Sequence, residues 1–328
     1  MITINYVYSI DFYLDITVKQ EDFSMGGYDF FIKKVTNSEE LFKELQNDKY
    51  KNKWAFRGQF SDWYLETTLE RACKCADLIG ERDREYIEDS MIRQFKRLYD
   101  GQDKDVVQND TLYCLSLMRH HGAPIRLIDF TYSIYIAAYF ALEYAYDNRP
   151  KEKKRLMENK NNERACTVWC VNMNWVEEQG IRIIKSTEIK QEDLITQRSY
   201  LTKRDDTTFK PLYMENQYTF ISFENPVLQH SRLHLQQGVF LCPGNINKTF
   251  EQNLKALNGW DQETAVVKIV CKADTQDLCD ALEKCRRMNI SRESLFPGLD
   301  GLAQAMKYHI SFYRKLYDYY AKPLKIDP

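Results

Sequence analysis

An arginine inside an apolar run, WAFRGQ, is the residue whose type and setting most suggest chemistry. A guanidinium in such a segment needs either a carboxylate from the protein or an anion from outside. The neighbouring glycine would let a ligand approach the backbone closely. Arg57, Gly58 and Gln59 are therefore candidates for binding an anionic ligand, and a buried Arg–carboxylate pair is the alternative.

A second stretch of thirteen residues, RHHGAPIRLIDFT, holds two arginines, two histidines and an aspartate. Neutral His120 and His121 could hold ribose hydroxyls or move a proton, and Arg126 could pair with a phosphate. Thr131 could cap a helix or hold an amide. The structural alternative is a helix-capping histidine, an Arg126–Asp129 ion pair and an N-cap.

Two further sets of residues are considered for binding. If the segment RLHLQ is a strand, Arg232, His234 and Gln236 share one face, either toward a ligand or along a polar edge. The cysteines in CKC, from residue 73, and CTVWC, from residue 166, lack the two-residue spacing of structural zinc sites. Buried free thiols are predicted there, and no metal is expected.

Composition limits the class of protein. The 328 residues are 44% hydrophobic and carry a net charge of -2, which predicts a globular chain without a general nucleic-acid-binding coat. The first residues lack the pattern of a secretory signal, and no apolar run is long enough to span a membrane. Nine scattered cysteines do not suggest a secreted disulfide framework. A cytoplasmic protein with reduced thiols and no membrane partner is expected.

The elements that must position these residues follow from periodicity and turn signals. The sequence predicts one α+β domain over 1–328, with charged insertions near 151–164 and 185–213. Strands are expected at 54–59, 125–130, 167–171, 218–223, 239–242 and 265–270. Helices are expected at 41–45, 87–98, 112–118, 133–146, 275–288 and 302–320. Gly122 should end the third of these helices in a left-handed conformation.

With these motifs in order, the chain resembles the FRG (Phe-Arg-Gly) domain family from about residue 30 to 302. The triplet is Phe56-Arg57-Gly58. The further matching blocks are HHGAPIRLIDFT at 120–131, AYFA at 138–141, Arg232 with QQGVF at 236–240, and LFPGLDGL at 295–302.

That family is in turn similar to the ADP-ribosyltransferase fold, a split β-sheet core surrounded by helices. The resemblance implies that NAD is the substrate and that Arg57 contacts its diphosphate. It also implies that the turn from Asp129 to Ser133 holds the nicotinamide side, with Gln236 near the reacting ribose. Transferases of that fold commonly have a glutamate in the third motif, where the candidates in this chain are Gln236, Gln237 and Gly238. Either Asp129 or Glu224 then supplies the carboxylate, or catalysis is weak or absent.

The resemblance leads to a first hypothesis, an NAD-dependent ADP-ribosyltransferase with Arg57, Asp129 and Gln236 as catalytic residues. It would act as an intracellular toxin or anti-phage effector on a macromolecule, with an antitoxin protein as a further partner. RNA or single-stranded DNA is considered first, because the segment RSYLTKR at 198–204 interleaves basic and aromatic residues, although it could equally be a surface loop. The second hypothesis is a non-catalytic nucleotide-binding or sensor module in phage defence. A nuclease using a histidine with Asp129 lacks a second acidic residue at metal-ligand spacing.

Overall fold

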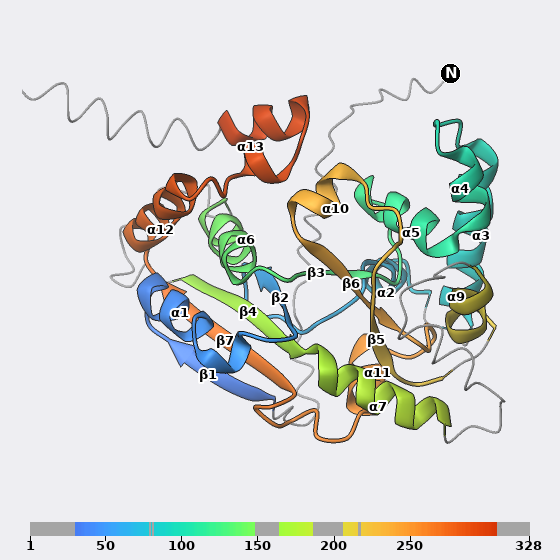
Figure 1. The fold of residues 1–328 in the computed structure, drawn as a ribbon, viewed down its shortest axis with the longest axis horizontal. Coiled ribbons are helices and arrows are strands. Elements are labelled where there is room, and N and C mark those ends of the chain that lie inside the picture. The colour runs from blue at the N-terminus through green and yellow to red at the C-terminus, as the bar shows by residue number, and fades with distance from the viewer. Residues whose placement is uncertain are drawn as a thin grey trace, which may run out of the picture.

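A single mixed β-sheet organises the protein. The computed structural model describes residues 30–78, 80, 82–147, 164–185, 206–215 and 218–306. Within them, seven strands lie in the order β1-β7-β4-β2-β3-β6-β5 (Figure 1). The strands are β1 (Phe31–Val35), β2 (Trp54–Gln59), β3 (Ile128–Thr131), β4 (Arg164–Asn172), β5 (Ile221–Glu224), β6 (Gly238–Pro243) and β7 (Val266–Ala273). The pairing of β1 with β7 is parallel and the other pairings are antiparallel.

Helices cover both faces of this sheet, which confirms the mixed α+β class. The longer helices are α1 (Ser38–Leu45), α2 (Thr68–Cys75), α3 (Asp83–Leu98), α5 (Thr111–His120), α6 (Ile134–Asp147), α7 (Met173–Lys185), α9 (Asp206–Tyr213) and α12 (Thr275–Arg287). The shorter ones are η1 (Asp48–Tyr50), α4 (Lys104–Asn109), α10 (Ser231–Leu235), α11 (Phe250–Lys255) and α13 (Arg292–Leu295), and residues 299–306 are also helical.

Parts of three predicted segments lie outside the described residues. These are 151–163 of the first charged insertion, 186–205 of the second, and 307–320 of the C-terminal helix. The end of the second insertion is α9, whose Asp206 accepts a hydrogen bond from the backbone of Thr111 at 2.6 Å. This part of the predicted insertion therefore packs against the core rather than extending from it.

The sheet has its fewest paired residues between β2 and β3. Six residue pairs join β2 to β4 and four join β3 to β6, but Phe56 and Thr131 form the one pair between β2 and β3. The sheet thus consists of two halves, β1-β7-β4-β2 and β3-β6-β5, that meet at a junction called here the seam. Arg57 strengthens the seam, because its Nη1 donates to the Asp129 carbonyl oxygen at 2.7 Å.

Helix α6 packs on β2, and Figure 1 shows it next to the ends of β2 and β4. Side chains alternate along a strand, so Arg57 and Gly58 face opposite sides of the sheet. A Cβ on Gly58 would lie 2.1 Å from the Ala137 carbonyl oxygen and 2.5 Å from the Ala141 nitrogen. The glycine therefore permits close approach of a helix, which corrects the expectation that it makes room for a ligand.

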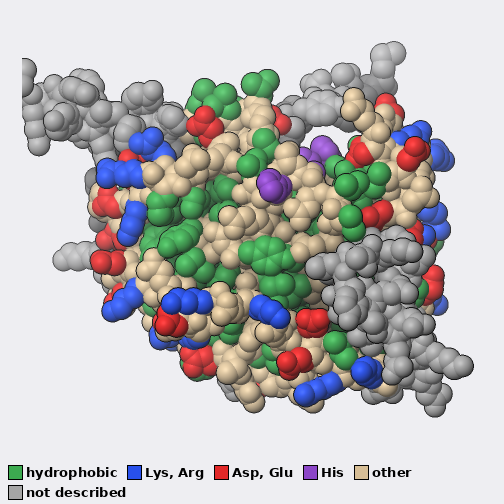
Figure 2. Space-filling view, viewed as in Figure 1, with side chains coloured by type: hydrophobic (Ala, Val, Ile, Leu, Met, Phe, Trp, Pro, Cys, Tyr) green, Lys and Arg blue, Asp and Glu red, His purple; other side chains and the backbone are tan. Residues whose placement is uncertain are grey.

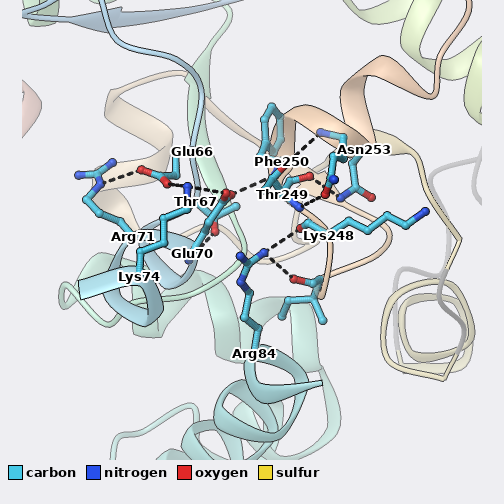
Figure 3. Close-up of polar contacts among 12 residues, drawn as sticks. Glu66, Thr67, Glu70, Arg71, Lys74, Arg84, Lys248, Thr249, Phe250 and Asn253 are labelled. Carbon is cyan, nitrogen blue, oxygen red and sulfur yellow. Dashed lines mark hydrogen bonds and ion pairs between the residues drawn. The ribbon is translucent and has the colours of Figure 1, made fainter. Parts of the chain in front are cut away.

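On the other side of the molecule, α2 and α3 are tied to the segment around α11 (Figure 3). The buried Glu70 carboxylate accepts a hydrogen bond from the Phe250 backbone nitrogen at 3.0 Å and pairs with Lys74 at 3.1 Å. Arg84 donates to the carbonyl oxygens of Ile246 and Lys248. These contacts fix α2 and α3, two of the three helices described between β2 and the motif-bearing α5, against the segment that follows β6.

Candidate functional site

Helix α5 delivers the first group of polar side chains to the seam. Asp110 caps its N-terminus by accepting a hydrogen bond from the Tyr113 nitrogen at 2.8 Å. Residues 111–118 are buried, and the side chains become accessible in the last turn, at Arg119 and His120. Gly122 has a φ of 85°, which confirms the predicted end of the helix.

Asp129, on β3, is the carboxylate around which the site is built. Arg119 donates its Nε to Asp129 Oδ2 at 2.8 Å, and its Nη2 lies 2.6 Å from the same oxygen. The Arg126–Asp129 ion pair considered as the structural alternative is not formed, because Arg126 pairs with Glu88 instead. Burial acts to raise the pKa of Asp129, but Arg119, Arg57 and Arg232 together hold it below its usual value. The carboxylate is therefore ionised near neutral pH while 42% of its side chain stays exposed to solvent.

Three histidines pack together next to this carboxylate. The His120 ring centroid lies 4.7 Å from that of His121 and 4.5 Å from that of His230. Burial first, and then the neighbouring Arg232 and His121, lower the pKa of both His120 and His230 to about 4, with His230 also lowering that of His120. His120 and His230 are thus neutral at pH 7 and can accept or donate hydrogen bonds. Figure 2 shows histidine side chains at the surface near the position of α10 in Figure 1.

His230 was not predicted as a site residue. It is the N-cap of α10, because its Nδ1 accepts a hydrogen bond from the Leu233 nitrogen at 3.2 Å. The signal in the sequence was a polar residue directly before SRLHL. His120 Nδ1 is buried and has no hydrogen-bond partner within the described part of the chain.

Arg232 reaches the seam from α10 and not from a strand. Its Nη1 donates to the His120 carbonyl oxygen at 3.4 Å. The prediction of an extended segment with Arg232, His234 and Gln236 on one face is wrong, because the His230 cap starts a short helix here. In a helix, Arg232 and Gln236 still share a face because they are four residues apart, whereas His234 lies off that face and is exposed.

Gln236 and Thr131 connect α10 to the seam. Thr131 Oγ1 donates to the Gln236 carbonyl oxygen at 2.7 Å and accepts from the Ser133 nitrogen at 3.0 Å. The Gln236 side chain donates to the Leu295 carbonyl oxygen at 3.1 Å. Both predicted site residues therefore lie at the seam, where their side chains form hydrogen bonds with backbone atoms.

We call the group formed by Arg57, Arg119, His120, His121, Asp129, His230 and Arg232 the seam cluster. Its members come from β2, the end of α5, β3 and the start of α10. Comparison with known protein families gives a match to the part of the chain that supplies Arg57 to Asp129. Residues 52–150 match the family model of the FRG domain. The FRG region contributes Arg57, Arg119, both adjacent histidines and Asp129, whereas His230 and Arg232 lie beyond it. No curated protein and no solved structure matches the chain.

Two residues of the FRG region that were predicted to bind a ligand, Arg126 and Gln59, make hydrogen bonds inside the protein instead. Arg126 is 1% exposed; its Nη2 lies 2.5 Å from Glu88 Oε2 and its Nη1 donates to the Tyr213 carbonyl oxygen at 2.7 Å. Gln59 Oε1 accepts from the Trp169 indole at 3.0 Å within the core. The structure thus corrects both expectations, since neither side chain is open to a ligand. A pattern cannot tell which of two arginines in one motif meets a buried glutamate from a distant helix.

The remaining expectations concern metals and membranes. The nine cysteines are free thiols; those of the CTVWC segment are buried in β4, and Cys73 is buried in α2. Cys75, at the end of α2, is exposed, so the prediction of a buried thiol there is wrong. Among the described residues, no three histidine, cysteine or acidic side chains gather in a way that could hold a metal ion. None of the helices described here combines the length and apolar character of a membrane span.

Proposed function

We propose that the seam cluster binds NAD and that the protein transfers ADP-ribose from it to a macromolecule. The observation that carries the proposal is the gathering of three arginines around the partly exposed Asp129: Arg119 pairs with its carboxylate, Arg57 donates to its carbonyl oxygen, and Arg232 donates to the nearby His120 carbonyl oxygen. Because His120 and His230 are neutral at pH 7, the arginines exceed the carboxylate by two positive charges. A dinucleotide diphosphate carries two negative charges, and arginine binds such groups with charge-assisted, often bidentate hydrogen bonds.

The architecture supports this ligand over a simple anion. In the ADP-ribosyltransferase fold, which the motif order resembles, the nucleotide lies where a split sheet brings a first-strand arginine near a later strand and helix. Here Arg57 and Asp129 face each other across the seam, and Thr131 with Gln236 joins the following elements. We propose that the seam corresponds to that split.

The reaction would proceed by substitution at C1′ of the nicotinamide ribose. The bond from C1′ to the nicotinamide nitrogen breaks, nicotinamide leaves with the electron pair, and a nucleophilic oxygen or nitrogen of the acceptor bonds to C1′. The acceptor's proton passes to solvent or to His121 at the exposed edge of the cluster. Asp129 stabilises the positive charge that develops on the ribose. Glu224 is a poor candidate for that role, since it is 4% exposed and hydrogen-bonded to Tyr213 and Ser222.

A transfer assay tests this proposal. The purified protein is incubated with NAD labelled in the adenylate, together with separate pools of cellular RNA, single-stranded DNA and protein. Label should join one pool while nicotinamide is released in equal amount, with a nucleic-acid pool expected first because of the basic and aromatic segment at 198–204. Asp129→Ala should lower the rate by about a hundredfold or more, and Glu224→Ala much less. No transfer to any pool in the presence of bound NAD would reject the enzymatic proposal.

A second function, nucleotide binding without catalysis, is favoured by one observation. The Gln236 amide, which the resemblance aligns with the glutamate common in the transferase fold, donates to the Leu295 carbonyl oxygen. A neutral amide in that position can order the turn but supplies no negative charge. Under this alternative, NAD binds to the wild-type protein with no release of nicotinamide, and Asp129→Ala changes affinity rather than rate.

A further inference from the structure

Helix α13 meets α10 next to the seam. The end of α13 contacts Gln236 and Arg232. The Leu295 carbonyl oxygen accepts the hydrogen bond from the Gln236 amide at 3.1 Å. The guanidinium carbon of Arg232 lies 4.4 Å from the centroid of the Phe296 ring, within the range of a cation–π interaction. The third arginine of the seam cluster is therefore in contact with a residue far outside the FRG region.

The Phe296 ring is itself held by contacts with two other side chains. Phe140 of α6 packs edge-on against it, with centroids 6.0 Å apart. Arg292 lies over the ring at 4.7 Å, and its Nε is 3.1 Å from Oε1 of the fully buried Glu143. Because both contacts lead to α6, the ring is fixed to the same helix that packs on β2.

The backbone after Phe296 is also constrained. A Cβ on Gly301 would lie 1.8 Å from the Phe296 carbonyl oxygen, so the helix at 299–306 can approach only because this residue is glycine. Gly298, with a φ of 106°, makes the turn between them. The two glycines of the LFPGLDGL block therefore allow the chain to fold closely around Phe296.

We propose that Phe296 is a positioning residue whose ring holds the Arg232 guanidinium at the seam, beside His120 and His230. An arginine side chain has many rotamers, and an aromatic face that selects one of them reduces the entropy lost when an anion binds. The role in ligand binding rests on the function proposed above, whereas the placement of Arg232 does not depend on it.

The placement can be measured without any ligand. Burial is the largest cause that lowers the pKa of His120 and His230, and Arg232 and His121 add to it for both rings. His230 also lowers the pKa of His120, whereas Asp129 raises that of His230. Imidazole NMR signals, assigned with His→Gln variants, report both pKa values. Arg232→Gln and Phe296→Leu should each raise them by about half a unit or more. The double variant should show no further rise, and Phe296→Tyr should keep the wild-type values.

Several results would overturn the proposal. If Arg232→Gln leaves both histidines unchanged, Arg232 does not lie beside them. If Phe296→Leu raises the pKa values as much in the Arg232→Gln background as in the wild type, the ring acts through burial alone. Phe42→Leu is the matched control, because Phe42 also lies under a cation, with Lys284 at 5.5 Å, but in another part of the core. An equal pKa change in this control would mean a general loss of packing.

A calorimetric titration with NAD then connects the placement to binding. Phe296→Leu and Arg232→Gln should each weaken affinity by about tenfold, and the double variant by no more than the stronger single one. Additive losses would reject the coupling between the two residues. If the wild-type protein binds no NAD, the proposed function fails, whereas the NMR result on Arg232 still decides the placement.

Discussion

At the scale of single residues, the two arginines of the RHHGAPIRLIDFT segment have opposite roles. Arg119 lies at the accessible end of α5 and pairs with the half-exposed Asp129. Arg126 is enclosed and pairs with Glu88, which is also buried. A buried pair is costly to break because the remaining charge loses its partner, whereas an accessible pair contributes little to stability. The first arginine is thus available for a ligand, and the second holds the fold.

This difference gives a paired prediction. Arg126→Ala should lower the free energy of unfolding by about 3–5 kcal/mol, because it leaves Glu88 charged or unsatisfied in the core. Arg119→Gln should cost no more than about 1 kcal/mol but should weaken NAD binding. Urea denaturation and calorimetry on the same preparations measure both quantities. A stable Arg126→Ala protein with lost binding would instead support a ligand role for Arg126.

The histidines predict how stability depends on pH. Their folded-state pKa values of about 4 lie below the ordinary value of 6.5, so the unfolded chain binds more protons between these limits. The free energy of unfolding should therefore fall as pH drops from 6.5 to 4. The rings are partly exposed, so we expect a total loss on the order of 2 kcal/mol. The His120→Gln/His230→Gln double variant should flatten this slope, and an unchanged slope would contradict the assignment.

At the scale of elements, the FRG triplet combines two functions on the two faces of β2. Arg57 crosses the seam on one face, and Gly58 admits α6 on the other. The strand at 54–59 and the helix at 133–146, which is α6, could be predicted, because a strongly patterned segment forms much the same element wherever it packs. It could not be predicted that Gly58 makes room for a helix rather than a ligand, since that helix lies about eighty residues further along the chain.

The prediction at this scale is a pair of glycine substitutions. Gly58→Ala places a Cβ against the α6 backbone and should destabilise the protein by about 3 kcal/mol. Gly180→Ala is the matched control, since the nearest atom to its new Cβ lies at 3.6 Å and the residue is inside α7. That change should be neutral or stabilise by up to about 1 kcal/mol. If both substitutions change thermal unfolding equally, close packing of α6 on Gly58 does not contribute to stability as predicted.

The short helix α10 shows the limit of sequence patterns. The segment RLHLQ at 232–236, most of which lies in this helix, could be interpreted as extended because its alternate polar positions fit a period of two. A cap by His230 and contacts from α13 determine the outcome instead, and both involve residues whose proximity only the fold creates. The prediction named Arg232 and Gln236 as candidates but gave them the wrong geometry.

At the scale of the whole molecule, two half-sheets joined by one residue pair create the place where distant segments meet. The FRG region supplies β2, α5, β3 and α6, and the later segments add His230, Arg232 and the α13 support. A protein ending after the FRG region would therefore lack one arginine of the seam cluster. The charge surplus that we assign to a diphosphate exists only in the complete sheet.

The most direct test of this account is a calorimetric titration of NAD into the wild-type protein, Arg57→Ala, Arg57→Gln and Arg71→Ala. Arg71 is the matched control, an arginine of the FRG region on α2 whose side chain is 44% exposed and paired with Glu66. Wild type and Arg71→Ala should bind with equal affinity. Both Arg57 variants, shown to be folded by circular dichroism, should lose about 1.5–3 kcal/mol, as expected for a charge-assisted hydrogen bond. Unchanged affinity in folded Arg57 variants, or no binding of NAD by the wild type, would contradict the assignment of the seam as the nucleotide site.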